Sequence, residues 1–167
     1  MTPEELGRQF QSCTSSAFRL ECLPSYDVTE DAERDAYTAW LAGKELPSPH
    51  RDWPELVASV VAAGKRMQRV RVIRQMTEYI RFQMEWGYPA NVAAGEAIYM
   101  LDHEPPGLLR VDFWLFDDTT AVVLEYDERG QFTGLALAGA VEPYRQAREM
   151  ALKLSVPFHE YRASLAT

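Results

Sequence analysis

Several segments of the chain alternate apolar and polar residues with a period of two, which is typical of β-strands. Strands are therefore expected at 17–23, 68–74, 97–101, 111–116, 121–126 and 132–138. Only the short polar segments 117–120 and 127–130 separate the last three. Because short polar side chains and glycine favour tight turns, we expect residues 111–138 to form an antiparallel meander. Trp114 and Phe116 are expected to be buried in a central strand of the sheet.

Other segments repeat apolar residues every three or four positions, as amphipathic helices do. Residues 2–5 and 52–55 each combine a capping residue, a proline in the first turn and a glutamate three positions after the cap. Helices are therefore expected after residues 2 and 52. Further helices are expected between the cap Thr29 and Gly43, over 77–86 and over 142–154. Residues 87–96 are expected to be a turn followed by a loop of small residues.

The order of these elements predicts a mixed α/β (α+β) fold, with one mixed sheet that ends in the antiparallel meander and is covered by helices. A parallel crossover is expected between the strands near residues 70 and 98. Residues 51–161 would form the sheet core, and residues 1–50 a helix–strand–helix extension. Since no repeat or interdomain linker interrupts the pattern, residues 1–167 are expected to form a single domain.

The composition is that of an ordinary globular protein, with 47% hydrophobic and 25% charged residues. No run approaches the roughly 18 apolar residues of a membrane span. The acidic N-terminal segment lacks the apolar core of a secretory signal, and two cysteines suit a reducing compartment. A cytoplasmic protein is therefore expected. The net charge of −8 makes direct nucleic-acid binding unfavourable, because such binding relies on neutralising phosphates.

Residues 64–81 depart from this acidic background, because they contain six of the 17 basic residues and a single acidic one, Glu78. Arg69 and Arg71 alternate with apolar residues, and Arg74 follows them, so one interpretation is a solvated strand face. The alternative is a binding site for a small anion or an acidic partner, formed by Arg69, Arg71, Arg74 and Arg81 together with Tyr79 at the strand–helix junction. Aromatic side chains at helical spacing, Tyr79 among them, are more often core residues than a ligand cage.

Five stretches, AFRLE, AAGKRMQRVRVI, YIRF…NVAAGE, DFWLFDD and VPFHEY, resemble an actinobacterial domain family of unknown function. The resemblance covers nearly the whole chain. It implies a neighbouring helix-turn-helix regulator, because such proteins are often encoded beside members of this family, and it implies no biochemical activity. Residues 53–161 are also remotely similar to one half-domain of the phospholipase D-like fold, which serves in some regulators as a non-catalytic sensor.

Active phospholipase D-like domains carry the motif HxKxxxxD before the turn of this hairpin. Aligning Asp117 with its aspartate places Arg110 at the histidine and Asp112 at the lysine. Arginine is no nucleophile near neutral pH, and a carboxylate repels a phosphate. The site, if inherited, is degenerate. A magnesium-dependent nuclease site built on Asp117, Glu125 and Asp127 would lack the lysine that such sites place two residues after a carboxylate.

Two classes of function remain open at this stage. The missing catalytic groups favour a non-catalytic interaction or sensor module that works with a helix-turn-helix transcriptional regulator. The alternative is a phosphodiesterase or metal-dependent nuclease-like effector that uses the carboxylates of the meander. The sequence contains no glycine-rich phosphate loop, and its histidines and cysteines lack metal-ligand spacing, so no cofactor or metal is expected.

Overall fold

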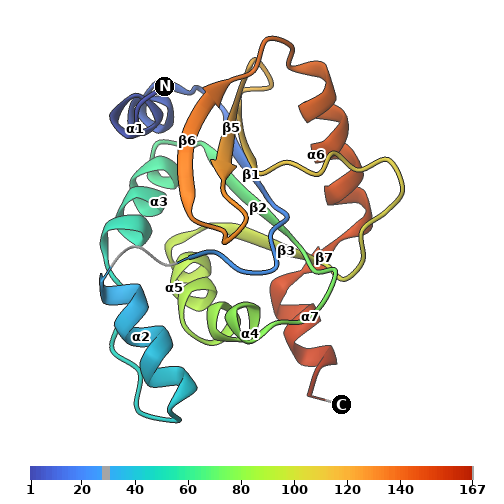
Figure 1. Ribbon diagram of the computed structural model, residues 1–167. Helices are drawn as coiled ribbons and strands as arrows, with labels where there is room; N and C mark the ends of the chain where they lie inside the picture. The colour runs from blue at the N-terminus through green and yellow to red at the C-terminus, as the bar shows by residue number, and fades with distance from the viewer. Residues whose placement is uncertain (28–30, 167) are drawn as a thin grey trace.

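The computed structural model describes residues 1–27 and 31–166, so the expected cap Thr29 lies outside the described residues (Figure 1). The described helices are α1 (Pro3–Ser12), α2 (Asp31–Leu41), α3 (Asp52–Ala62), α4 (Glu78–Glu85), α5 (Gly87–Ala94), α6 (Glu142–Leu154) and α7 (Phe158–Ser164). The strands are β1 (Ser16–Glu21), β2 (Arg66–Val72), β3 (Ala97–Leu101), β4 (Phe113–Phe116), β5 (Thr120–Tyr126), β6 (Phe132–Leu137) and β7 (Val156–Pro157).

One seven-stranded mixed sheet, with the strand order β6-β5-β4-β1-β2-β3-β7, forms the centre of the fold. The strands β1, β2 and β3 are parallel, whereas β4, β5 and β6 form an antiparallel meander. The predictions of a mixed sheet, of a parallel crossover between residues near 70 and 98, and of the meander are therefore confirmed. The strand expected within the N-terminal extension, β1, lies in the middle of the sheet between β2 and β4.

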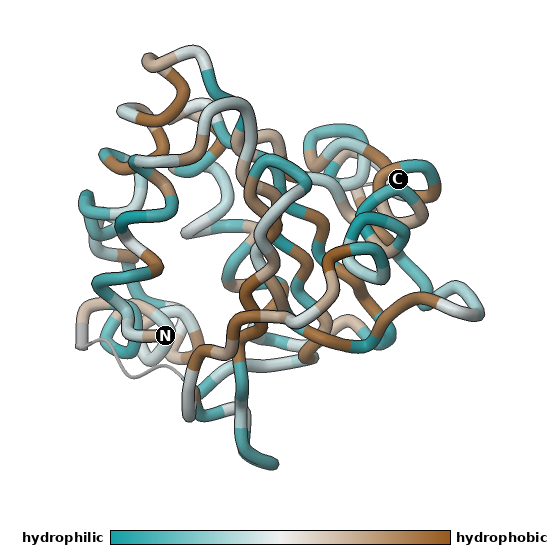
Figure 2. Tube along the Cα trace, turned by 90° about the horizontal axis from the view of Figure 1, so that it is seen from above, coloured by the Kyte–Doolittle hydropathy of each residue, from teal (hydrophilic) through white to brown (hydrophobic). Residues whose placement is uncertain are grey.

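The two faces of the sheet differ in chemistry. One face presents apolar side chains such as Leu20, Val70 and Phe113, which pack against Ala147 and Ala151 of α6. The helices α3 and α5 lie on the opposite side of the sheet from α6 (Figure 1). Hydrophobic residues gather along the central strands, and hydrophilic residues occupy much of the outer helices (Figure 2). The face beneath α3 to α5 carries charged residues and forms the candidate site.

Local sequence explains several element boundaries. Thr2 caps α1, because its hydroxyl accepts a hydrogen bond from the Glu5 backbone N–H and the Glu5 carboxylate accepts one from the Thr2 N–H. Gly130 has a φ of +80°, which suits glycine, and its carbonyl accepts a hydrogen bond of 2.9 Å from the Asp27 N–H. This contact holds the segment after β1 against the β5–β6 turn. No helix of the described chain has the length and apolar composition to cross a membrane.

Two regions differ from the sequence prediction. Residues 87–94, expected to be a turn and a loop, form the helix α5, which ends at Gly95 with a φ of +111°. Pro89 is compatible with this helix because it lies in the first turn, where a backbone N–H has no intrahelical partner. The chain after α6, in which no element was predicted, forms β7 and α7, and Phe158 of α7 joins the core.

Candidate functional site

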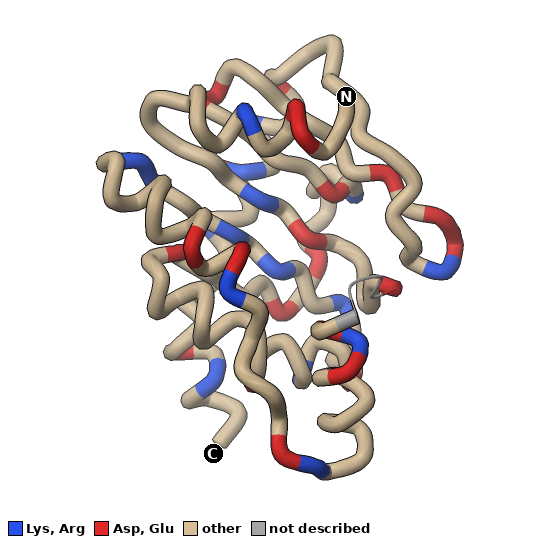
Figure 3. Tube along the Cα trace, turned by 90° about the vertical axis from the view of Figure 1, so that its left-hand side faces the viewer, with Lys and Arg blue, Asp and Glu red and all other residues tan. Residues whose placement is uncertain are grey.

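The face of the sheet beneath the helices carries an ordered set of charged side chains at its centre. In the register of the parallel pair, Arg19 lies beside Arg69, and Glu21 lies beside Arg71. On the other side of β1, Arg19 lies opposite Trp114 of β4. Residues two apart on a strand share a face, so these five side chains lie on the same side of the sheet. Basic and acidic residues are accordingly neighbours on the central strands (Figure 3).

Glu21 is the centre of this network. One of its carboxylate oxygens, Oε1, accepts a hydrogen bond from Arg69 and lies 3.7 Å from Arg19 Nε. The other, Oε2, lies 3.7 Å from Arg71 Nη1 and accepts a hydrogen bond from the Tyr88 hydroxyl. Burial on its own acts to raise the pKa of Glu21, but the guanidinium groups, that of Arg69 foremost, lower this pKa to about 2. The carboxylate is therefore ionised at neutral pH.

Two further buried carboxylates complete the network. Asp112 accepts hydrogen bonds from Arg19 Nη2, at 2.9 Å, and from the Tyr26 hydroxyl. Glu96 accepts a hydrogen bond of 2.7 Å from Arg69 Nε. Together with Glu21, these carboxylates balance the three arginines, so the network as a whole is electrically neutral.

The arginines nevertheless retain hydrogen-bonding capacity. In the described part of the chain, Arg19 Nη1 and both Nε and Nη1 of Arg71 are buried and have no hydrogen-bond partner. The exposed fraction is 4% for Arg19 and zero for Arg71. A buried polar group without a partner typically costs about 1–3 kcal/mol, so native proteins seldom retain one without a reason. The Arg19 guanidinium lies where a bound molecule can supply the missing acceptor, because this side chain lines a cavity.

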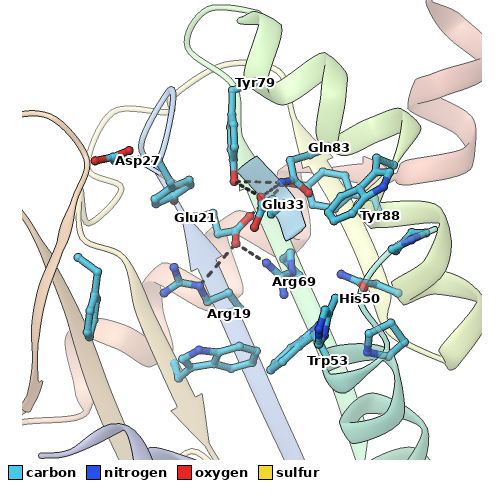
Figure 4. A pocket seen from close by; sticks show the side chains of 18 of the residues that line it. Arg19, Glu21, Asp27, Glu33, His50, Trp53, Arg69, Tyr79, Gln83 and Tyr88 are labelled. Carbon is cyan, nitrogen blue, oxygen red and sulfur yellow. Dashed lines mark hydrogen bonds and ion pairs between the residues drawn. The ribbon is translucent and has the colours of Figure 1, made fainter. Parts of the chain in front are cut away.

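The cavity has a volume of about 440 Å³, which lies within the usual range for small-molecule sites (Figure 4). Its floor is formed by β1, β2 and β4, and its walls by the helices α2 to α5 with their connections and by the meander. The aromatic residues of its lining are Tyr26, Trp53, Tyr79, Trp86, Tyr88, Trp114, Tyr126 and Phe132. The polar residues are Arg19, Glu21, Asp27, Glu33, His50, Arg69, Gln83 and Asn91.

Four of the aromatic rings make a continuous wall. The centroid of the Tyr26 ring lies 5.9 Å from that of Tyr79 and 5.1 Å from that of Tyr126, whose ring lies 5.9 Å from that of Phe132. Burial raises the pKa of Tyr26 and that of Tyr79 well above their usual values. Both phenols are therefore protonated at neutral pH and can donate hydrogen bonds.

The covering side of the cavity carries carboxylates. Glu33 of α2 accepts hydrogen bonds from the Tyr79 hydroxyl, at 3.1 Å, and from the Gln83 side chain. Figure 4 shows Glu33 in front of the sheet, between Tyr79 of α4 and the arginines of β1 and β2. Asp27, which is exposed, also lines the cavity. The floor of the cavity thus presents two guanidinium groups beside one carboxylate, whereas the side that covers it presents two carboxylates.

The structure brings only some of the predicted arginines together. Arg69 and Tyr79 line the cavity, and Arg71 is buried next to Glu21. The interpretation of Arg69 and Arg71 as part of a solvated strand face is wrong, because helices cover that face of the sheet. Arg74 is outside the lining and pairs with Glu104, at 2.6 Å.

Arg81 occupies a different place from the one its predicted role requires. It is exposed on α4 and is not among the lining residues, whereas Tyr79, two positions earlier on the same helix, is. Residues two apart on a helix point in different directions, so Tyr79 and Arg81 do not share a face. Within the described residues, Arg81 therefore does not form a cluster with Arg69 and Arg71.

The three residues that align with the phospholipase D-like motif also lie apart. Arg110 is exposed and pairs with Glu104, whereas Asp112 is buried in the arginine network. Asp117 begins the turn after β4, and its carboxylate accepts hydrogen bonds from the backbone N–H groups of residues 14–16. Burial acts to raise the pKa of Asp117, but these N–H groups hold it well below its usual value. Asp117 therefore fixes the connection before β1.

The carboxylates considered for a magnesium site are separated by β5. Asp117 precedes this strand, whereas Glu125 lies near its end and Asp127 in the turn that follows. A strand of seven residues spans roughly 20 Å, which is too far for one cation to bridge. Asp127 instead accepts hydrogen bonds from two backbone N–H groups of its own turn. Among the residues that the structure describes, no three His, Cys, Asp or Glu side chains gather as a metal-ligand set.

Two buried charged residues of the site, Arg19 and Glu21, were not singled out from the sequence. A signal was present, because the alternation in AFRLE places Arg19 and Glu21 on one face and Phe18 and Leu20 on the other. Two opposite charges on one face of a strand whose other face is apolar are also found on solvated strands. Only the cover of helices distinguishes the two cases.

Comparisons with known proteins identify a family and distant structural likenesses. Residues 4–163 match the model of the family described as Domain of unknown function (DUF6879). No curated protein matches the sequence. Among solved structures, the chain is similar to TrmBL2, an archaeal chromatin protein whose structure shows a novel mode of DNA binding. The identity is 8% and the TM-score 0.46, over 96% of this chain and 48% of that one, so this chain spans about half the length of TrmBL2.

Proposed function

We propose that this chain, which belongs to the DUF6879 family of domains of unknown function, is a non-catalytic sensor module that binds a small molecule in the cavity on β1, β2 and β4. The observation that carries the proposal is a buried, charge-balanced arginine–carboxylate network that is open to a cavity of about 440 Å³. Buried ion-pair networks contribute little net stability, because apolar residues of similar volume often stabilise a protein as well or better. Recognition of a polar ligand gives the network a role.

The protonation states of the cavity support recognition rather than proton transfer. A general acid or base works best when its pKa lies near the working pH. The pKa of Glu21, at about 2, lies far below neutrality, and the pKa values of Tyr26 and Tyr79 lie well above it. These groups keep one protonation state, so the charges and hydrogen bonds around a bound ligand are fixed: the Tyr26 and Tyr79 hydroxyls donate to Asp112 and Glu33.

We assign the partner as a helix-turn-helix transcriptional regulator, in keeping with the family's resemblance noted above. The net charge of −8 gives the domain itself little attraction for phosphates, so DNA contacts are assigned to the regulator. The helix α2 is suited to carry the signal, because it contributes Glu33 to the cavity while residues such as Asp35 and Thr38 are exposed on it. A ligand that contacts Glu33 therefore acts on an element of the protein surface.

Ligand binding is tested by thermal shift and tryptophan fluorescence with a library of small polar metabolites. A ligand present at 100 times its Kd stabilises the folded state by roughly 2.7 kcal/mol, which is readily measured. Asn91→Phe places a large ring in the cavity from α5, whereas Val92→Phe adds the same ring at a neighbouring exposed position. We expect Asn91→Phe to abolish the response to ligand and Val92→Phe to retain it. Equal responses in both variants would place the ligand elsewhere.

The regulatory role is tested separately, with a helix-turn-helix regulator as the purified partner protein. We expect the purified regulator to bind the domain and the affinity to change when a cavity ligand is added. The Asn91→Phe variant should bind the regulator but lose the dependence on ligand. If the regulator does not bind under any of these conditions, the sensor role is wrong even if the cavity binds a small molecule.

A further inference from the structure

The charged side chains that line the cavity differ between the sheet and the segments that cover it. The sheet contributes the guanidinium groups of Arg19 and Arg69, which extend from neighbouring strands in register with one another. The segments that cover the sheet contribute the carboxylates of Asp27 and Glu33 (Figure 4). The carboxylate of Glu21 lies between the two guanidinium groups on the floor. A molecule that fills the cavity therefore meets two guanidinium groups and one carboxylate on the floor, and two carboxylates on the covering side.

The floor is suited to an anionic group. Arg19 Nη1 is buried and has no hydrogen-bond partner within the described residues, so an acceptor on the ligand would remove an unsatisfied donor. Arg71 lies on the same face of the sheet, next to Glu21 and beneath the Tyr26 ring, and adds positive charge without lining the cavity. Together with Arg69 and Arg19, it lowers the pKa of Glu21 to about 2, so the resident carboxylate of the floor is ionised at neutral pH.

The covering side is suited to a cationic group. Tyr26, Tyr79, Tyr126 and Phe132 form the aromatic wall beside it, and aromatic faces attract ammonium groups. Burial raises the pKa of Tyr79, and the nearby Glu33 raises it further, which indicates negative potential at this position. Carboxylates beside aromatic rings are the combination that an ammonium group requires.

The charges that surround the cavity determine which net charge the ligand should have. The buried network is neutral, so a simple anion would add an uncompensated negative charge close to Asp27 and Glu33. A simple cation would leave Arg19 Nη1 without an acceptor. Resting on the proposed function, we infer that the ligand is a zwitterion of the amino-acid or short-peptide class, with its carboxylate toward Arg19 and Arg69 and its ammonium toward Asp27 and Glu33. Its aromatic or apolar side chain contacts the indole of Trp114 on the floor and that of Trp53 on the adjoining wall.

Three dipeptide probes on one scaffold test this inference with the wild-type protein. They are alanyl-phenylalanine, its N-acetyl derivative, which lacks the positive charge, and its C-terminal amide, which lacks the negative charge. Isothermal titration calorimetry gives the affinity of each. We expect the zwitterion to bind at least about tenfold more tightly than either capped form, the effect of losing one charge-assisted hydrogen bond.

Variants assign the two ends of the ligand. Arg69→Gln is expected to weaken binding of the zwitterion and of the N-acetyl form but not of the amide. Glu33→Gln is expected to weaken binding of the zwitterion and of the amide but not of the N-acetyl form. If Arg69→Gln fails to fold, the ranking of the three probes on the wild-type protein still decides the question.

The outcomes separate this inference from the proposed function. If the N-acetyl form binds as tightly as the zwitterion or more tightly, the zwitterion inference is wrong, whereas binding that Asn91→Phe abolishes still supports the cavity as a ligand site. The same holds if no dipeptide binds while a library compound does so in an Asn91-dependent way. If neither the dipeptides nor any library compound binds, both proposals are overturned.

Discussion

Glu21→Gln is the sharpest test of the arginine network, because a single carboxylate of 8% exposure lies next to three guanidinium groups. The substitution preserves the size of the side chain and removes its charge. Arg69 and Arg19 then keep one carboxylate partner each, Glu96 and Asp112 respectively. The buried cluster changes from neutral to a net positive charge.

Two lines of reasoning give the size of the effect. Lowering the pKa of Glu21 from its ordinary value of 4.5 to about 2 corresponds to about 3 kcal/mol of stability, since one pKa unit is worth roughly 1.4 kcal/mol. Removing one partner of a buried ion pair typically costs about 3–5 kcal/mol. We therefore expect Glu21→Gln to lower the free energy of unfolding by about 3 kcal/mol at neutral pH.

The stabilisation by Glu21 should depend on pH in one direction. Because the pKa of Glu21 is lower in the folded state, the stabilisation is complete above pH 4.5 and is lost as the pH falls toward 2. The difference in unfolding free energy between wild type and Glu21→Gln should shrink over this window. Urea unfolding, followed by circular dichroism at several pH values between 7 and 2, measures the difference.

The exposed Glu125 provides the control for this experiment. Glu125→Gln removes an equal charge outside the network and should change the unfolding free energy by no more than about 0.5 kcal/mol. If Glu21→Gln behaves like this control at neutral pH, the three arginines do not depend on Glu21. A difference between wild type and Glu21→Gln that persists unchanged to pH 2 would refute the assigned pKa.

Four other substitutions and one assay test the fold and the chemistry. Trp114→Ala should cost about 3–5 kcal/mol in urea unfolding, because the side chain is buried on β4, an interior strand of the sheet, and a loss below about 1 kcal/mol would contradict the placement. Gly130→Ala should cost about 1–3 kcal/mol, since φ is +80° and a Cβ would lie 2.7 Å from the Ser25 carbonyl oxygen; an unchanged midpoint would argue against this turn. Asp117→Ala should cost about 2 kcal/mol and Asp117→Asn less, because the carboxylate accepts three backbone hydrogen bonds; equal losses would count against that role. The purified protein should leave DNA intact in the presence of Mg²⁺, and cleavage abolished by Asp117→Ala and by Glu125→Ala would disprove this.

The local pattern of the sequence was sufficient to predict most of the secondary structure. Alternation with a period of two identified the six longer strands, and the capping box of Thr2 identified the start of α1, because both signals depend on side chains close together in the chain. The helix α3 also begins where it was expected, but Asp52 is its first residue and the cap position is Arg51, without a side-chain cap hydrogen bond. The meander was also predictable, since its strands are joined by short turns. The helix α5 was missed because Gly87 and Pro89 are typical of turns. Its helical form is stabilised by long-range packing of Tyr88 against Phe158 and against residues of α4, which the local sequence does not reveal.

The candidate site depended on the tertiary structure. Alternation placed Arg69 and Arg71 on one strand face, but it carries no information about what covers that face. In the fold, β1 lies between β2 and β4, so the charged face of Arg19 and Glu21 joins that of the other arginines. Helices far away in sequence then cover all four side chains and remove them from most of the bulk solvent. A charged residue on a strand is consistent with solvent or with a site, and long-range packing decides which, because only distant segments of the chain can remove water from it.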